Sequence, residues 1–168
     1  RVVIKKLMSH LAQDEDFIAR FIDEANIVVN LTHGNIVPVF DMGEVDGEYF
    51  IAMEYIPGRD LRDVLRRYLK SERLPSLSIG AYLLRETARG LSYAHNKTDA
   101  SGKSLGIIHR DVSPPNILLS NKGDIRLTDF GLAKAATQLL VTDPGIVKGK
   151  FAYLSPEAAN GQKVDARA

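Results

Sequence analysis

The stretch IIHRDVSPPNILLS, residues 107–120, places a histidine, an arginine and an aspartate side by side and an asparagine five residues after the aspartate. Isoleucine, valine and leucine flank this polar cluster, and a similar pattern returns in LTDFG, residues 127–131. Apolar flanks anchor a loop against a core, and a positioned chemical site needs such a rigid support. The stretch therefore predicts polar side chains held at the mouth of a cleft.

The composition limits the class of protein. The chain has 168 residues, 45% hydrophobic and 26% charged, which suffices for one globular domain with a core. The formal net charge of +1 and the lack of a basic stripe argue against nucleic acid or an anionic membrane as partner. The chain has no cysteine and no apolar run of the roughly eighteen residues that span a bilayer. We expect a cytoplasmic domain, with any membrane anchor of the full-length protein outside these residues.

The first third of the chain favours strands around one helix. Acidic residues open a predicted helix over residues 14–31, where the helix dipole favours them. Asp46-Gly47 is a hairpin signal between two of the strands. Three strands are expected, at residues 2–7, 36–42 and 48–56. The apolar face of the helix recurs at helical spacing in Phe17, Phe21, Ala25 and Val28.

Helices dominate the rest of the chain. Asp60 can cap a short helix over residues 61–69, and Ser76 or Ser78 can cap a longer one that runs to about His95. The buried side of the longer helix is expected to carry Ile79, Leu83, Leu91 and Ala94. A polar surface loop at residues 96–106 precedes two short strands, at residues 117–120 and 125–128, joined by the turn NKGD. Strands followed by helices indicate an α+β layout with a hinge near Pro57-Gly58.

Three polar residues of the second half match the needs of a hard cation and a hydroxyl. Mg²⁺ prefers oxygen ligands and usually takes one or two carboxylates together with substrate phosphates. Asn116 and Asp129 supply such oxygens. Asp111 then remains free to orient a hydroxyl group.

With these residues in place, the chain resembles the eukaryotic-like serine/threonine protein kinases of bacteria along essentially its whole length. The kinase motifs occur in order, as VVIK, DEA, HRDVSPPN, DFG and SPE. The resemblance implies a two-lobe α+β fold with a small β-rich N-lobe and a helical C-lobe. The N-lobe portion would be residues 1–56, the hinge residues 57–60, and the C-lobe portion, through the activation segment, residues 61–168.

The resemblance also implies Mg²⁺-dependent transfer of the γ-phosphate of ATP to serine or threonine hydroxyls of a protein substrate. Lys5 would hold the α- and β-phosphates, with Glu24 as its ion-pair partner. Asp111 would orient the substrate hydroxyl and accept its proton, while Asn116 and Asp129 would hold Mg²⁺.

The stretch FIAMEYIPGRD, residues 50–60, resembles the adenine site of the same family. Met53 would be the gatekeeper side chain, and Asp60 would bind the ribose. The backbone would bind adenine through Glu54 and Ile56, and Val3 and Leu118 would sandwich the base. An apolar column linking the lobes would consist of Val28, Val39, His109 and Phe130, which makes His109 structural rather than catalytic.

Several positions depart from the family pattern. Ser113 stands where serine/threonine kinases usually carry a lysine near the γ-phosphate, but the loop of tyrosine kinases is also absent, so serine or threonine substrates are favoured. Lys150 replaces the usual threonine before the closing motif, and we hypothesise that it supplies the charge that Ser113 lacks. Arg110 precedes the catalytic aspartate, and Thr142 is the expected phosphorylation site of the activation segment, ahead of Thr137.

Two alternative functions remain open at this point. One is a pseudokinase that signals without turnover; against it, the strand lysine and the two motif aspartates are all present. The other is a small-molecule phosphotransferase of kinase-like fold, which would lack an activation segment ending in SPE. The Gly-rich loop and the lower helices of a kinase are not among these residues, so we expect an internal fragment that is inactive by itself.

Overall fold

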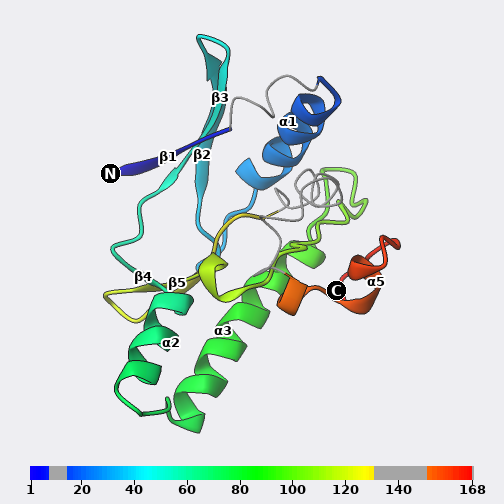
Figure 1. Ribbon diagram of the computed structural model, residues 1–168. Helices are drawn as coiled ribbons and strands as arrows, with labels where there is room; N and C mark the ends of the chain where they lie inside the picture. The colour runs from blue at the N-terminus through cyan, green and yellow to red at the C-terminus, as the bar shows by residue number, and fades with distance from the viewer. Residues whose placement is uncertain (8–14, 131–150, 168) are drawn as a thin grey trace.

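The computed structural model of the chain describes residues 1–7, 15–130 and 151–167. Figure 1 shows a sheet with a helix beside it at one end of the molecule and further helices toward the other end, with short strands between them. Buried side chains form two hydrophobic clusters, one in the strand-rich part and one in the helix-rich part, and the second also includes Val28 from the first helix. The predicted division into a strand-rich and a helix-rich part is therefore present.

Three antiparallel strands and a helix form the first part. They are β1 (Val2–Lys6), α1 (Glu15–Val29), β2 (Val39–Val45) and β3 (Glu48–Glu54), with β3 in the middle of the sheet. Asp46 and Gly47 both have positive φ, of 52° and 77°, in the predicted hairpin turn. The core of this part contains Phe21, Ala25, Val37, Ile51 and Met53. Phe17 belongs to the predicted helix face, but its side chain lies outside what the structure describes.

The second part combines a small sheet with helices. Its elements are β4 (Gly58–Asp60), α2 (Leu61–Lys70), α3 (Leu77–His95), a 3₁₀ turn (Pro114–Asn116), β5 (Ile117–Ser120), β6 (Ile125–Leu127), a 3₁₀ turn (Phe151–Tyr153) and α5 (Pro156–Ala159). The strand order is β4-β5-β6, all antiparallel. A Cβ on Gly58 would lie 1.9 Å from the carbonyl oxygen of Leu119, so only glycine permits this close pairing of β4 with β5.

Both predicted helix caps are confirmed. The side chain of Asp60 accepts a hydrogen bond from the Asp63 N–H at 2.8 Å, and Ser76 accepts one from the Ile79 N–H at 3.4 Å. The predicted burial of Ile79 is wrong, because this residue lies in the first turn of α3 and is 44% exposed. The buried positions of α3 begin at Glu86, where the helix passes over β6.

The strand predicted at residues 36–42 starts later, because its first residues pair with a different sheet. Ile36 forms a parallel bridge with Leu127, and the Val37 N–H donates to the Leu127 carbonyl at 2.8 Å. Pro38 has no N–H and separates this pairing from β2. The segment therefore connects the two parts of the molecule instead of extending the first sheet.

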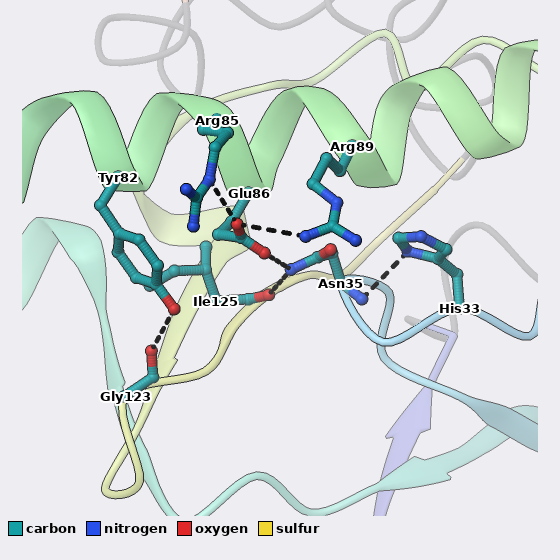
Figure 2. A network of polar contacts seen from close by, with 8 residues as sticks. All are labelled: His33, Asn35, Tyr82, Arg85, Glu86, Arg89, Gly123 and Ile125. Carbon is teal, nitrogen blue, oxygen red and sulfur yellow. Dashed lines mark hydrogen bonds and ion pairs between the residues drawn. The ribbon is translucent and has the colours of Figure 1, made fainter.

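A buried polar network reinforces this connection (Figure 2). The Asn35 side-chain amide donates to Glu86 Oε2 at 3.0 Å and to the Ile125 carbonyl at 2.9 Å. Arg85 Nε donates to Glu86 Oε1 at 2.8 Å, and Arg89 Nη1 lies 3.5 Å from the same oxygen. These contacts, with the hydrogen bond from Asn35 first, lower the pKa of Glu86.

A glycine on α3 allows the network to form at close range. A Cβ on Gly90 would lie 2.9 Å from the Asn35 carbonyl oxygen, which accepts a hydrogen bond from the Leu127 N–H at 2.8 Å. The helix, the loop and β6 are thus bound together at the start of the LTDFG segment. Within the described parts of the chain, no helix combines the length and the apolar character required to cross a bilayer.

Candidate active site

The loop before β5 is anchored in the core by one of its own residues, the buried His109. His109 is 1% exposed, and its ring lies 4.5 Å from that of Phe130 between centroids. Its Nε2 lies 3.0 Å from the Thr128 carbonyl oxygen, and the Asp111 N–H donates to its Nδ1 at 3.3 Å. Since a carbonyl only accepts and an N–H only donates, the ring is neutral with its proton on Nε2.

The electrostatics of His109 agree with this structural role. Burial lowers its pKa and outweighs the opposing effects of Asp111 and Asp129. Val28 and Phe130 belong to one buried cluster, and Val39 packs against it. The residues of the predicted apolar column therefore lie in or against one buried cluster, and His109 contacts it through Phe130.

Asp111 is held by residues that follow it in the same loop. The Ser113 hydroxyl, in a residue that is 5% exposed, donates to Asp111 Oδ1 at 3.1 Å. The Asn116 side-chain amide donates to the Asp111 carbonyl at 2.9 Å. The Thr128 N–H donates to the Asn116 carbonyl at 3.0 Å, which ties the loop to the segment that carries Asp129.

Backbone strain marks the same two segments. Arg110 and Asp129 adopt positive φ angles of 65° and 63°. Such angles are uncommon for residues other than glycine, although aspartate tolerates them better than arginine does. Strain of this kind costs about 1–3 kcal/mol and persists where the surrounding structure holds it, typically at functional sites.

Asp129 forms an ion pair with the lysine of β1. Lys5 Nζ lies 2.8 Å from Asp129 Oδ1, and the two side chains are 46% and 25% exposed. The pair joins the first sheet to the second part of the molecule. The backbone of Glu24, the predicted partner of Lys5, lies in α1, but its side chain is outside what the structure describes, so that pair stays a prediction.

The predicted adenine residues gather where the two sheets meet. Sheet register pairs Val3 with Met53 and Asp60 with Leu118. Leu118 and Ile56 pack against the cluster that contains Met53. Val3 is 39% exposed, while Asp60 Oδ1 is engaged as the cap of α2 and its Oδ2 lies 3.5 Å from Arg62 Nη2.

The oxygen atoms near the loop fit a hard cation. The side-chain nitrogen of Asn116 donates to the Asp111 carbonyl, which leaves the side-chain oxygen Oδ1 of Asn116 as the atom for a cation. Asp129 supplies a partly exposed carboxylate. The described residues contain no cluster of three or more histidine, cysteine, aspartate or glutamate side chains suited to a metal. One carboxylate and one amide suit a cation that is shared with phosphate oxygens.

Comparison with known protein families shows which family has this arrangement. Residues 1–168 match the protein kinase domain family over their whole extent. The chain belongs to the protein kinase domain family. The kinase domain is 41% identical over 167 residues to the tyrosine-protein kinase MasK of Myxococcus xanthus, and covers 26% of that protein. It is 38% identical over 169 residues to the serine/threonine-protein kinase PknJ of Mycobacterium tuberculosis, again covering 26%.

Solved structures agree with the fold. The kinase domain of Mycobacterium tuberculosis PknI matches with a TM-score of 0.72 and 30% identity, over 99% of this chain and 56% of that one. The predicted α+β fold with a small strand-rich lobe and a helical lobe is therefore confirmed. The kinase domain here spans 26% of the length of MasK and of PknJ.

Sequence reasoning missed two contacts of the site. It treated Ser113 as a lost cation and did not foresee its hydrogen bond to Asp111. It also passed over Arg126, whose Nη1 lies 2.8 Å from Glu54 Oε2. Alternation along β6 offered a signal, because Ile125 and Leu127 are buried and Arg126 between them must face the other way. Lys150, Thr137 and Thr142 lie outside the described residues.

Proposed function

We propose that the protein containing this kinase domain transfers the γ-phosphate of ATP to serine or threonine hydroxyls of protein substrates. The hydrogen-bonded connection from Asp111 through Asn116 and Thr128 to the segment of Asp129, with Lys5 paired to Asp129, carries the proposal. The arrangement connects the proposed base Asp111 with the proposed Mg²⁺ ligands Asn116 and Asp129, which lie in the segments flanking β5 and β6. The ion pair adds the proposed phosphate-binding Lys5 from the first sheet. Phosphoryl transfer asks a protein for this kind of positioning and charge neutralisation.

Each residue has a defined role in the proposed reaction. The substrate hydroxyl oxygen bonds to the γ-phosphorus, the bond from that phosphorus to the β,γ-bridging oxygen breaks, and Asp111 accepts the hydroxyl proton. Asn116 and Asp129 would hold Mg²⁺, which neutralises phosphate charge when bound. Lys5 orients the α- and β-phosphates, and we propose Glu24 as the second partner of this lysine.

The nucleotide base would bind at the junction of the two sheets. Leu118 forms the floor and Val3 the roof, with Met53 behind the ring, and the register of the strands supports this placement. Backbone groups of Glu54 and Ile56 would bind the edge of the ring. Asp60 would bind the ribose through the carboxylate that also caps α2.

The class of the accepting hydroxyl needs its own readout. Relatives of this chain are named both as serine/threonine kinases and as a tyrosine kinase. Ser113 gives the loop a neutral hydroxyl in place of the expected lysine. We keep serine and threonine as the proposed acceptors, because the loop of tyrosine kinases is absent.

The test is transfer from labelled ATP to a generic protein substrate by the natural full-length protein, with and without Mg²⁺. Hydrolysis of the product then identifies the phosphorylated amino acid. Asp129→Asn should abolish transfer, whereas Asp124→Asn, in the exposed turn after β5, should not. Phosphotyrosine as the sole product would overturn the serine/threonine assignment. Nucleotide binding without transfer would favour the pseudokinase.

A further inference from the structure

The end of β6 contacts the first part of the molecule through three consecutive residues. The contacts are an ion pair from Arg126 to Glu54, a hydrogen bond to the Leu127 carbonyl from Val37, and a contact of 3.8 Å from Thr128 Oγ1 to Met53 Sδ. The backbone bond of Leu127 and the polar network around Asn35 already join the two parts. The ion pair is therefore not required merely to keep them together.

Glu54 occupies a special place in the chain. It is the last residue of β3, and its N–H donates to the Pro38 carbonyl at 2.9 Å. Its N–H is thus committed to the sheet, and its carbonyl begins the link to β4. An ion pair that holds the Glu54 side chain therefore restrains the position of the residue from which that carbonyl extends.

Arg126 lies beside the proposed base site, on the strand next to that of Leu118. It is the cross-strand partner of Leu118, the proposed floor of that site. Its side chain is 23% exposed and that of Glu54 is 36% exposed, so both charges are partly removed from water. Their Nη1–Oε2 distance of 2.8 Å is that of a charge-assisted hydrogen bond.

Placing the Arg126 guanidinium here costs free energy, because it buries a hydrogen-bond donor that a smaller polar side chain would not have. Arg126 Nε is buried and has no hydrogen-bond partner within the described part of the chain. A buried donor without a partner is unfavourable. The contact that offsets the unpaired Nε is the ion pair with Glu54, so the role of Arg126 lies at its guanidinium end.

We infer that Arg126 is a positioning residue for the adenine ring. It holds the end of β3 at a set distance above Leu118, so that the Glu54 carbonyl meets the ring edge. This inference rests on the proposed function, because it presupposes that the kinase domain binds ATP at this junction. Arg126 is not among the residues proposed to bind the phosphates or the substrate hydroxyl, so its loss should affect recognition of the base and leave phosphate recognition and the chemical step intact.

The experiment separates these two parts of the nucleotide. Adenosine affinity is measured by calorimetry, tripolyphosphate affinity by competition against ATP, and kcat and KM for ATP by turnover, all with the natural full-length protein. Arg126→Gln should weaken adenosine binding and raise KM about five- to tenfold, as expected for loss of a partly buried charged hydrogen bond. Tripolyphosphate affinity and kcat should change less than about twofold.

Three further variants make the test specific. Arg126→Lys keeps the charge and should restore adenosine affinity to within about threefold of the wild type. Glu54→Gln removes the charge at the other end and should reproduce the effect of Arg126→Gln, even if Arg126→Gln does not fold. Arg73→Gln is the matched control, because Arg73 lies exposed between α2 and α3, outside residues 50–60, and forms no ion pair within the described residues.

The outcomes are distinguishable. Unchanged adenosine affinity in Arg126→Gln and Glu54→Gln would overturn the inference, as would an equal loss of adenosine and tripolyphosphate affinity, which indicates general destabilisation. Both results would leave the proposed kinase function standing. A wild-type protein that binds no adenosine nucleotide at all would overturn the proposed function and this inference together.

Discussion

Glu86 and Asp129 are two acidic residues in neighbouring parts of the same lobe that differ in burial and in the partners of their carboxylates. The Glu86 carboxylate has a partner on each oxygen, Asn35 on one and Arg85 and Arg89 on the other, and the residue is 7% exposed (Figure 2). Asp129 has a side chain that is 25% exposed, a strained backbone and an ion pair with a lysine that is 46% exposed. A carboxylate satisfied on both oxygens holds a fold together, whereas one that keeps access to solvent can still bind a ligand.

The first way to test this contrast is to remove the partner of Asp129. Lys5→Met should lower the rate of phosphate transfer by at least about a hundredfold, because it removes the charge that is proposed to orient the nucleotide phosphates. The free energy of unfolding should change by less than about 0.5 kcal/mol, since exposed ion pairs contribute little to stability.

Lys6→Met is the matched control for that variant. Lys6 is the next residue of β1, is also exposed and is ion-paired with Glu48 within the same sheet. Its replacement should leave both the transfer rate and the unfolding free energy unchanged. If the two lysine variants lost activity equally, the special position of Lys5 would be refuted.

The second test removes the partner of Glu86. Asn35→Ala leaves a buried carboxylate oxygen and the Ile125 carbonyl without their donor, so it should destabilise the fold by about 1–3 kcal/mol. The transfer rate per folded molecule should stay within about threefold of the wild type, because the Asn35 carbonyl still holds β6. Chemical denaturation and turnover below the unfolding transition measure the two quantities.

The pH dependence of stability gives a second test of Asn35→Ala. Because the pKa of Glu86 is lowered in the folded state, its stabilisation is present above the ordinary pKa and is lost as the pH falls through the folded pKa. Asn35→Ala removes the main cause of the shift, so its loss of stability with acid should be shallower. Asn30→Ala, which removes only an exposed bond to the Asn26 carbonyl, should behave as the wild type.

The third test concerns the support of the proposed base. Ser113→Ala removes the hydroxyl that donates to Asp111 Oδ1 and should lower kcat about five- to tenfold while KM for ATP stays constant. Ser104→Ala removes a hydroxyl in the exposed loop at residues 96–106 and should leave kcat unchanged. An unchanged kcat in Ser113→Ala would mean that Asp111 is oriented without this serine.

The contrast also explains what could be predicted from the sequence. Most strand and helix positions follow from local patterns, as do both caps and the order of Asp111, Asn116 and Asp129, because these features depend on nearby residues. The start of β2 and the strand β4 do not, because they depend on pairing with β6 and β5. Asn35–Glu86 and Glu54–Arg126 join residues 51 and 72 positions apart, and the charged residues of helices and strands are ordinarily exposed. Nothing local distinguishes Glu86 from the exposed charged residues Arg85 and Arg89 on the same helix, because its burial depends on where β6 packs.

The smallest effect expected is on the pH dependence of stability through His109. Burial lowers its pKa in the folded state, so below the ordinary value of about 6.5 the unfolded chain binds a proton that the folded chain does not. Stability should therefore fall on acidification, by up to about 1 kcal/mol between pH 7 and 5.5. His109→Gln keeps an amide donor for the Thr128 carbonyl but does not titrate, so this part of the slope should disappear in it. An equal slope in both proteins would show that His109 takes up a proton while folded, and His109 could then no longer be regarded as a neutral support beneath Asp111.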